Sequence, residues 1–234
     1  GAVPNPDGTL LATAGRGSSN IYLIDAVNRR VLGNVSNPQA GPTTNPERLS
    51  SGILLGREPH EPTFTRNGKE LWVTLRGEDQ IAILDVEQAR RQLTGQGAAP
   101  AQAVRAYLPT INGPAQVWFS KDGMLAFVIS QKTAQLEILQ VNPDAKGYSR
   151  PKRLRLVDLS MQDKPAFTPF QKLSPDGSQM WLSHKLADAV SLVSVTDPGT
   201  VLATLPLGEM ARPNHLEFVD NGRGQVAYIS LARV

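Results

Sequence analysis

The side chains best suited to bind a ligand recur at two positions of a repeated strand–turn–strand pattern. The first position is the start of the first strand of a repeat, where the chain carries His60 with Glu61 and Asn214 with His215. The second position lies eight residues after a turn glycine, and the residues there are Arg16, Arg76, Gln131 and Lys185, with His184 beside the last. Imidazole, ammonium and guanidinium groups gathered at one place attract carboxylates and phosphates. The pattern therefore predicts a site for a small anionic ligand or a cofactor.

The predicted ligand-binding residues include all three histidines of the chain. The set is Arg16, His60, Glu61, Arg76, His184, Lys185, Asn214 and His215. Other roles are open for individual members. His60 could hydrogen-bond a neighbouring carboxylate or a backbone group, or coordinate a metal. Arg16 and Arg76 could simply pair with an acidic loop residue such as Glu78 or Asp79.

Sequence patterns typical of catalysis do not occur in the chain. There is no G-x-S-x-G elbow, no H-E-x-x-H helix, no phosphate-binding loop and no dinucleotide fingerprint. The three histidines lie in separate repeats, and the carboxylates form no convincing pair for acid–base chemistry. We therefore predict no catalytic residue and no metal site.

The elements that position these side chains follow from an internal repeat. An Asp-Gly or Asn-Gly dipeptide, which supplies the positive φ that a tight hairpin needs, occurs at residues 7, 67, 122, 176 and 221. In the later repeats an apolar residue stands before the turn, usually with a proline five residues ahead of it. A β-branched and aromatic run follows each turn, as in Leu71–Thr74 and Ala126–Ile129. Third strands are predicted at 21–25, 81–85, 136–139 and 190–193, and fourth strands at 31–35, 104–108, 154–158 and 201–205.

Four short strands in each repeat of about 45–60 residues predict an all-β fold, a β-propeller of four-stranded blades. About five blades are visible and the last is incomplete. The first strand of a blade lines the central channel, so the two positions with candidate ligand-binding residues should meet on the face opposite the Asp/Asn-Gly hairpins. One aromatic position, occupied by Trp72, Phe127, Trp181 and Tyr228, is predicted to pack between blades.

Composition narrows the classes of partner. The chain has 234 residues, a net charge of +3 and no cysteine, so disulfides and thiolate metal sites are excluded. Lys and Arg are scattered rather than clustered, which argues against a nucleic-acid partner. No apolar stretch approaches the roughly 20 residues that a membrane-spanning helix needs.

The segment Phe64–Gly77, continued by Ile81–Asp85, resembles the YVTN-type β-propeller repeat, and Leu173–Gly177 matches it as well. Proteins of this kind are related to the haem-bearing propellers of nitrite reductases and commonly have seven blades. The resemblance implies that residues 1–234 are a single propeller domain and a fragment of a longer chain. Two insertions depart from the repeat, at about 36–56 and 88–102, and the second begins with a predicted helical stretch at 88–93.

The resemblance identifies a fold and no reaction. The function expected first is a non-enzymatic scaffold that binds a ligand or a partner protein through its loop-rich face, without a cofactor. The alternative is a propeller that binds a modified haem, as in nitrite reductases or their maturation proteins, with His60, Arg76, His184 and His215 as matching candidates. A third possibility is the heavy subunit of a quinoprotein amine dehydrogenase. The resemblance and the absence of cysteine imply a periplasmic or extracellular location.

Overall fold

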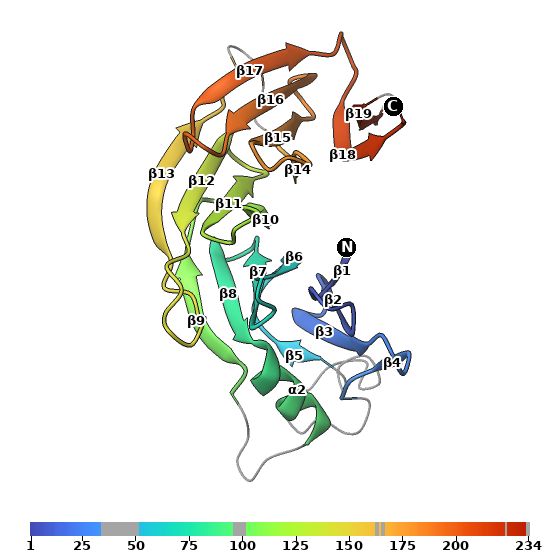
Figure 1. The fold of residues 1–234 in the computed structure, drawn as a ribbon, viewed down its shortest axis with the longest axis vertical. Helices are drawn as coiled ribbons and strands as arrows, with labels where there is room; N and C mark the ends of the chain where they lie inside the picture. Colours follow the sequence, from blue (N-terminus) through green and yellow to red (C-terminus); the bar gives the residue numbers. More distant parts are fainter. Residues whose placement is uncertain (34–51, 96–101, 162–163, 165–166, 223, 233–234) are drawn as a thin grey trace. The chain divides into compact units, whose positions relative to one another are not determined.

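The computed structural model describes residues 1–33, 52–95, 102–161, 164, 167–222 and 224–232. The strands in these residues form five antiparallel sheets in which successive strands are neighbours, except that β5 pairs with β3. The first three sheets are β1 (Ala2–Pro4), β2 (Leu10–Gly15), β3 (Asn20–Asp25), β4 (Arg30–Val31) and β5 (Ile53–Leu54); β6 (Pro59–Phe64), β7 (Glu70–Leu75), β8 (Gln80–Asp85) and β9 (Val104–Pro109); and β10 (Pro114–Phe119), β11 (Leu125–Ser130), β12 (Gln135–Gln140) and β13 (Lys152–Asp158). The last two are β14 (Phe170–Leu173), β15 (Gln179–His184), β16 (Ala189–Ser194) and β17 (Val201–Pro206); and β18 (Pro213–Asp220) and β19 (Gln225–Leu231). These sheets confirm the predicted all-β propeller of four-stranded blades with an incomplete fifth repeat (Figure 1).

The hairpins between the first and second strands of the blades are held by a local hydrogen-bond pattern. In the fourth blade the Ser174 hydroxyl donates to Asp176 Oδ1 at 2.5 Å and accepts from the Gln179 N–H at 3.0 Å. Gly177 follows with φ of 83°, a conformation that glycine adopts without steric cost. Hydrogen bonds from Ser174 and Ser178 lower the pKa of Asp176 to about 2. The hairpins therefore form from contacts within about five residues, which is why the repeat predicts them well.

The region between the first two blades differs from the prediction. The fourth strand expected at 31–35 is the short β4, and residues from 34 to 51 lie outside the described part. Within the loop expected at 36–56, β5 pairs with β3, with Ile53 opposite Ile21. Ile53 is buried in the same core as Ile21, so burial of its apolar side chain stabilises this short strand.

The helical stretch expected at 88–93 is α2 (Val86–Thr94). It begins earlier because Asp85, the last residue of β8, caps it by accepting a hydrogen bond from the Gln88 N–H at 2.9 Å. The helix ends at Gly95, whose left-handed φ of 67° lets its N–H bond the Arg91 carbonyl. Val86, Ala89 and Leu93 are buried, so this helix adds to the core of the second blade's unit.

The chain folds into two compact units, each with its own hydrophobic core. Unit 1 comprises Gly1–Thr110 and Pro143–Ser149, and unit 2 comprises Ile111–Asn142 and Arg150–Val234. In unit 1 β6 packs beside β1 and β2, and in unit 2 β14 packs beside β10 and β18. First strands of successive blades thus adjoin within each unit. That residues 1–234 make a single propeller domain stays a prediction.

The aromatic position that the blades share is fully buried in only two of the four blades. Trp72 and Phe127 are fully buried, as predicted. Trp181 is half-buried, donates to Gln179 and packs edge-on against Phe218 with ring centroids 5.4 Å apart. Tyr228 is 57% exposed, so the prediction was wrong there. In the described residues β19 pairs with β18 alone, so no outer strands of its own sheet cover this side chain.

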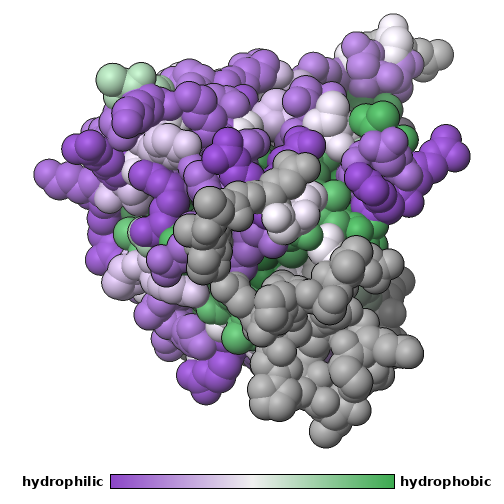
Figure 2. All heavy atoms as spheres, turned by 90° about the horizontal axis from the view of Figure 1, so that it is seen from below, coloured by the Kyte–Doolittle hydropathy of each residue, from purple (hydrophilic) through white to green (hydrophobic). Residues whose placement is uncertain are grey.

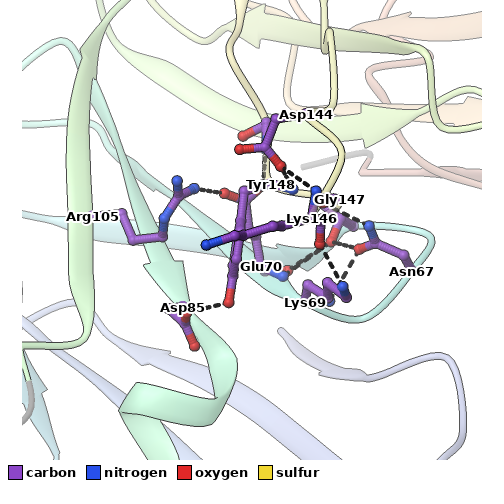
Figure 3. A network of polar contacts seen from close by, with 11 residues as sticks. Asn67, Lys69, Glu70, Asp85, Arg105, Asp144, Lys146, Gly147 and Tyr148 are labelled. Atoms are coloured by element: carbon purple, nitrogen blue, oxygen red, sulfur yellow. Dashed lines mark hydrogen bonds and ion pairs between the residues drawn. The ribbon is translucent and has the colours of Figure 1, made fainter.

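The loop between β12 and β13 carries a segment, Pro143–Ser149, that we call the docked segment because its contacts place it in unit 1. Figure 3 shows these contacts. Buried Glu70 of β7 pairs with Arg105 of β9 and accepts the Ser149 N–H at 3.0 Å. The Arg105 guanidinium lies 4.3 Å from the Tyr148 ring centroid, a cation–π contact. The docked segment is therefore attached to the second blade by a hydrogen bond to the ion-paired carboxylate of Glu70 and by the cation–π contact between Arg105 and Tyr148.

Two further hydrogen bonds complete this attachment. The Tyr148 hydroxyl donates to Asp85 Oδ2 at 2.7 Å, on the residue that caps α2. Asn67 Nδ2 donates to the Gly147 carbonyl at 2.8 Å, and Lys69 Nζ bonds the Lys146 carbonyl. The hydrogen bond to Asp85 raises the pKa of the Tyr148 hydroxyl. The second blade's hairpin and helix cap thus both contact the docked segment.

Hydrophilic residues cover most of the described surface on the face shown in Figure 2, with hydrophobic residues in patches between them. The described part of the chain contains no helix with the length and apolar character that crossing a bilayer requires.

Candidate functional site

The first strands of three blades begin with a β-bulge at the predicted ligand-binding positions. On β6 the register moves from Pro59 opposite Leu75 to Pro62 opposite Val73, so His60 and Glu61 lie across from Thr74 alone. Similar shifts occur after Pro114 on β10 and after Pro213 on β18. Bulges occur often beside functional sites because they redirect side chains out of the regular ladder. These strand starts are therefore built differently from the rest of each sheet.

Hydroxyl side chains on neighbouring strands satisfy backbone groups of the bulges. Thr74 Oγ1 accepts the Glu61 N–H at 3.0 Å, and Ser230 Oγ accepts the His215 N–H at 3.0 Å. Ser183 Oγ donates to the Asn214 carbonyl at 2.7 Å. The backbones of Glu61 and His215 are therefore fixed without a regular strand pair.

The two sets of predicted positions adjoin within the second, third and fourth blades. The Arg76 N–H bonds the Glu58 carbonyl at 3.0 Å, and the Lys185 N–H bonds the Phe167 carbonyl at 2.9 Å. The same contact joins Gln131 to Gly113 at 3.0 Å. The turn after the second strand thus lies directly against the start of the first strand, as the repeat predicted.

In unit 1 the structure brings Arg16 and Arg76 together around a residue that the sequence reasoning missed, Glu58. Arg76 Nε donates to Glu58 Oε2 at 3.0 Å, and Arg16 Nη2 lies 3.6 Å from Glu58 Oε1. The Arg76 side chain is 18% exposed, whereas those of Arg16 and Glu58 are about half exposed. The arginines do pair with an acidic residue, and that residue is Glu58, which directly precedes Pro59.

Glu58 has a left-handed backbone with φ of 53°, directly before Pro59. Gly113 and Arg212 hold the same pre-proline place with φ of 66° and 47°. A side chain in this conformation costs about 1–2 kcal/mol, and a following proline restricts the residue further. The signal that could have revealed Glu58 is this recurring residue before the proline, since glycine occupies it in one of the repeats.

The neighbouring residues of the second blade add a second pair and two candidate proton acceptors. Glu78 Oε1 accepts the Arg57 N–H at 2.8 Å and lies 3.8 Å from Arg57 Nε. The Glu61 side chain is 19% exposed, and Oε2 lies 3.6 Å from the Gly1 nitrogen. His60 is half-buried in the same bulge. Guanidinium, carboxylate and imidazole groups therefore lie on the bulged start of β6, on the turn against it and on the first-blade turn that reaches Glu58. We call these residues the unit 1 cluster: Arg16, Arg57, Glu58, His60, Glu61, Arg76 and Glu78.

The unit 1 cluster depends on a close approach at Gly77. A Cβ at this residue would lie 2.9 Å from Arg57 Cβ and 3.1 Å from the Arg57 carbonyl oxygen. We expect Gly77→Ala to lower the free energy of unfolding by about 1–2 kcal/mol, because the backbone at Arg57 must move. Gly17→Ala is the matched control, since Gly17 occupies the same place in the first blade with no atom within 4 Å. Urea denaturation of both variants measures the difference, and equal loss in the two would contradict the steric explanation.

In unit 2 His184 is buried inside the fourth blade and is 3% exposed. Its Nδ1 lies 3.1 Å from Thr168 Oγ1 and its Nε2 lies 2.9 Å from Ser191 Oγ. Burial lowers the pKa of His184 to about 4. This geometry places the ring in the blade interior with both nitrogens in hydrogen bonds, away from the loop-rich face where it was predicted.

The other predicted residues of unit 2 lie at strand starts and turns. The His215 ring packs against the Phe170 ring with centroids 4.7 Å apart. Asn214 lies in the β18 bulge, and Lys185 begins the turn after β15. Of the predicted residues, the structure thus brings Arg16 and Arg76 together at Glu58. His60 and Glu61 lie in the same unit, and Lys185, Asn214 and His215 lie in unit 2. Among the described residues, no group of three or more His, Cys, Asp or Glu side chains could hold a metal ion.

The sequence profile described as "Lactonase, 7-bladed beta-propeller" matches residues 3–223. The chain belongs to this lactonase propeller family. No curated protein matches the sequence. The family overturns the expected non-enzymatic scaffold, because its description is that of an enzyme and its structural relatives include gluconolactonases. The expectation that the protein is not an enzyme was wrong for the same reason.

Solved structures agree with the lactonase-family fold at low sequence identity. The hydrazine synthase of Kuenenia stuttgartiensis has a TM-score of 0.68 at 14% identity, over 97% of this chain and 54% of that one. The periplasmic gluconolactonase PpgL of Pseudomonas aeruginosa has a TM-score of 0.66 at 17% identity, over 97% and 61%. Dihydro-heme d1 dehydrogenase NirN has a TM-score of 0.66 at 16% identity, over 98% and 41%. The lactonase-family chain therefore spans about half to three fifths of the length of the hydrazine synthase and PpgL chains. The likeness to NirN supports the predicted relation to haem-bearing propellers at the level of fold.

Proposed function

We propose that the protein is a hydrolase that opens the ring ester of a lactone, and that the unit 1 cluster carries the reaction. The observation that carries this proposal is the match of a lactonase family to residues 3–223. The geometry supports it, because Glu61 and His60 lie on a bulge whose backbone Thr74 fixes, and the turn that carries Arg76 lies directly against the start of the same strand. Preorganised groups of this kind lower a barrier without reorganising during the reaction.

The proposed reaction is addition of water to the lactone carbonyl. Glu61 takes a proton from the water, whose oxygen forms a bond to the carbonyl carbon. The carbonyl oxygen becomes an oxyanion, and the guanidinium of Arg76 donates hydrogen bonds to it. The bond from this carbon to the ring oxygen then breaks, and the ring oxygen takes up the proton as a hydroxyl. The product is the open-chain hydroxy acid, and His60, the neighbour of Glu61 in the bulge, contacts the substrate.

The proposal is tested by following acid release from glucono-δ-lactone at constant pH, with spontaneous hydrolysis subtracted. We expect Glu61→Gln to lower kcat about a hundredfold, the range of a lost general base, and Arg76→Gln to lower kcat/KM by about tenfold or more. The matched controls are Glu87→Gln and Arg91→Gln, an exposed pair on α2. Hydrolysis no faster than the spontaneous rate in the unaltered protein would refute the proposed function.

Modified haem as a cofactor stays a prediction. The NirN likeness is its only support, at 16% identity. His184 does not fit the role of an axial ligand, because its ring is buried and both nitrogens are in hydrogen bonds with hydroxyl groups.

A periplasmic or extracellular location is supported by the description of PpgL as periplasmic. The YVTN-type label of the repeat, the binding of a partner protein or a small anionic ligand, and the absence of a nucleic-acid partner stay predictions.

A further inference from the structure

The guanidinium groups of the unit 1 cluster are neutralised by carboxylates of the same cluster. Arg16 and Arg76 share Glu58, at 3.6 and 3.0 Å, and Arg57 pairs with Glu78 at 3.8 Å. Each of these three guanidinium groups therefore has a carboxylate beside it, and none of them presents an unopposed positive charge to an approaching anion.

Glu58 is placed for this role at an energetic cost. Its φ of 53° before Pro59 is strained for any residue with a side chain, and the equivalent residue of the third blade is glycine. In return its carboxylate receives a hydrogen bond from Arg76 and a charge contact from Arg16, while 44% of the side chain stays exposed. Arg212 has the same conformation before Pro213 in the fifth blade, so this backbone belongs to the repeat, and Glu58 is the residue that places a carboxylate there in the second blade.

We infer that Glu58 makes the unit 1 cluster select an uncharged lactone over one that carries a phosphate or carboxylate group. This inference rests on the proposed function. A phosphate approaching Arg76 or Arg16 must lie beside the Glu58 carboxylate, so the two negative charges repel each other. Specificity of this kind comes from a repulsive group as well as from attractive ones.

An uncharged polyhydroxy lactone fits the paired groups. A hydroxyl both donates and accepts hydrogen bonds, so it can donate to a Glu58 oxygen while accepting from an N–H of Arg16. Hydrogen bonds to charged partners are about twice as strong as those between neutral groups. The substrate class expected for this site is therefore a neutral sugar lactone, in contrast to the anionic ligand that the basic residues predicted from the sequence.

The test compares kcat/KM for glucono-δ-lactone and for 6-phosphoglucono-δ-lactone in the unaltered protein and in Glu58→Gln. We expect the unaltered protein to favour the uncharged lactone by about tenfold or more, and Glu58→Gln to reduce this preference about tenfold through a lower KM for the phosphorylated lactone. Glu87→Gln removes a carboxylate from an exposed pair on α2 and should leave the ratio unchanged. Inorganic phosphate should inhibit Glu58→Gln more strongly than the unaltered protein.

The outcomes separate this inference from the proposed function. Preference of the unaltered protein for the phosphorylated lactone, or an unchanged ratio in Glu58→Gln, overturns the role of Glu58 while leaving lactone hydrolysis standing. Hydrolysis of neither lactone refutes the proposed function. In that case titration of inorganic phosphate by calorimetry still tests Glu58, because tighter binding to Glu58→Gln than to the unaltered protein is expected and equal binding overturns it.

Discussion

Glu70→Ala is expected to lower the free energy of unfolding by about 3–5 kcal/mol, the range found when one partner of a buried charge pair is removed. Glu70 is completely buried, and its carboxylate pairs with Arg105 and accepts the Ser149 N–H at 3.0 Å (Figure 3). Without it the Ser149 amide has lost its carboxylate acceptor, and a buried amide without a partner is costly. Urea unfolding followed by tryptophan fluorescence measures the loss.

Two further variants separate charge from hydrogen bonding. Glu70→Gln keeps an oxygen that can accept the Ser149 N–H, so we expect a smaller loss, about 1–2 kcal/mol. Glu87→Gln breaks an exposed pair with Arg91 and should change stability by less than about 1 kcal/mol. A loss in Glu70→Ala no larger than in Glu87→Gln contradicts the importance of the buried carboxylate.

The same change should release the docked segment. Lys146 lies in this segment, and its carbonyl is hydrogen-bonded to Lys69. We expect trypsin to cleave after Lys146 faster in Glu70→Ala than in the unaltered protein, because cleavage requires the segment to open locally. Unchanged cleavage together with a large loss of stability would place the effect elsewhere in the second blade.

His184 is expected to make the protein less stable as the pH falls from about 6.5 to about 4. Burial lowers the pKa of His184 to about 4, against an ordinary value of about 6.5. In this window the unfolded chain takes up a proton on His184 and the folded chain does not, so protonation favours unfolding. The loss should accumulate to about 3 kcal/mol and level off below about pH 4, since the shift is about 2.5 units.

The measurement is the urea unfolding of the unaltered protein and of His184→Gln from pH 7.5 to pH 4.5. His184→Gln is expected to be less stable at pH 7.5, because it loses a hydrogen bond to Thr168 or Ser191, and to show a much smaller dependence on pH. His215→Gln is the matched control for removal of a histidine and should keep the slope, since His184 is still present. An equal slope in the unaltered protein and in His184→Gln would falsify the assignment.

The wrong expectation about enzymatic activity has a physical reason. Recognised catalytic motifs are short because their residues lie on one turn or one helix. The proposed lactone-opening groups come from different strands and loops, with Arg16 in the first blade and His60, Glu61 and Arg76 in the second. No local spacing marks such a set, so the absence of motifs was not a sign of an inert scaffold.

The prediction of candidate residues was better for position than for environment. The repeat correctly placed the residue after the second strand beside the start of the first strand, because the hairpin sets that register. It could not show that Glu58 lies between two arginines, since a left-handed residue before proline turns the backbone in a way that strand periodicity does not describe. It also could not show that His184 points into the blade, where Thr168 and Ser191 surround it.

What the sequence determined by itself is the repeat of strands and hairpins. The contacts responsible, such as Ser174 with Asp176 and Gln179, join residues no more than five apart, so a short segment encodes them completely. Only the tertiary structure decided which charges neutralise each other and which polar groups are buried. Arg76 reaches Glu58 across 18 residues, and Ser149 reaches Glu70 across 79. Such pairs depend on how the strands pack, because the number of residues between two polar groups does not determine the distance between them in the folded chain.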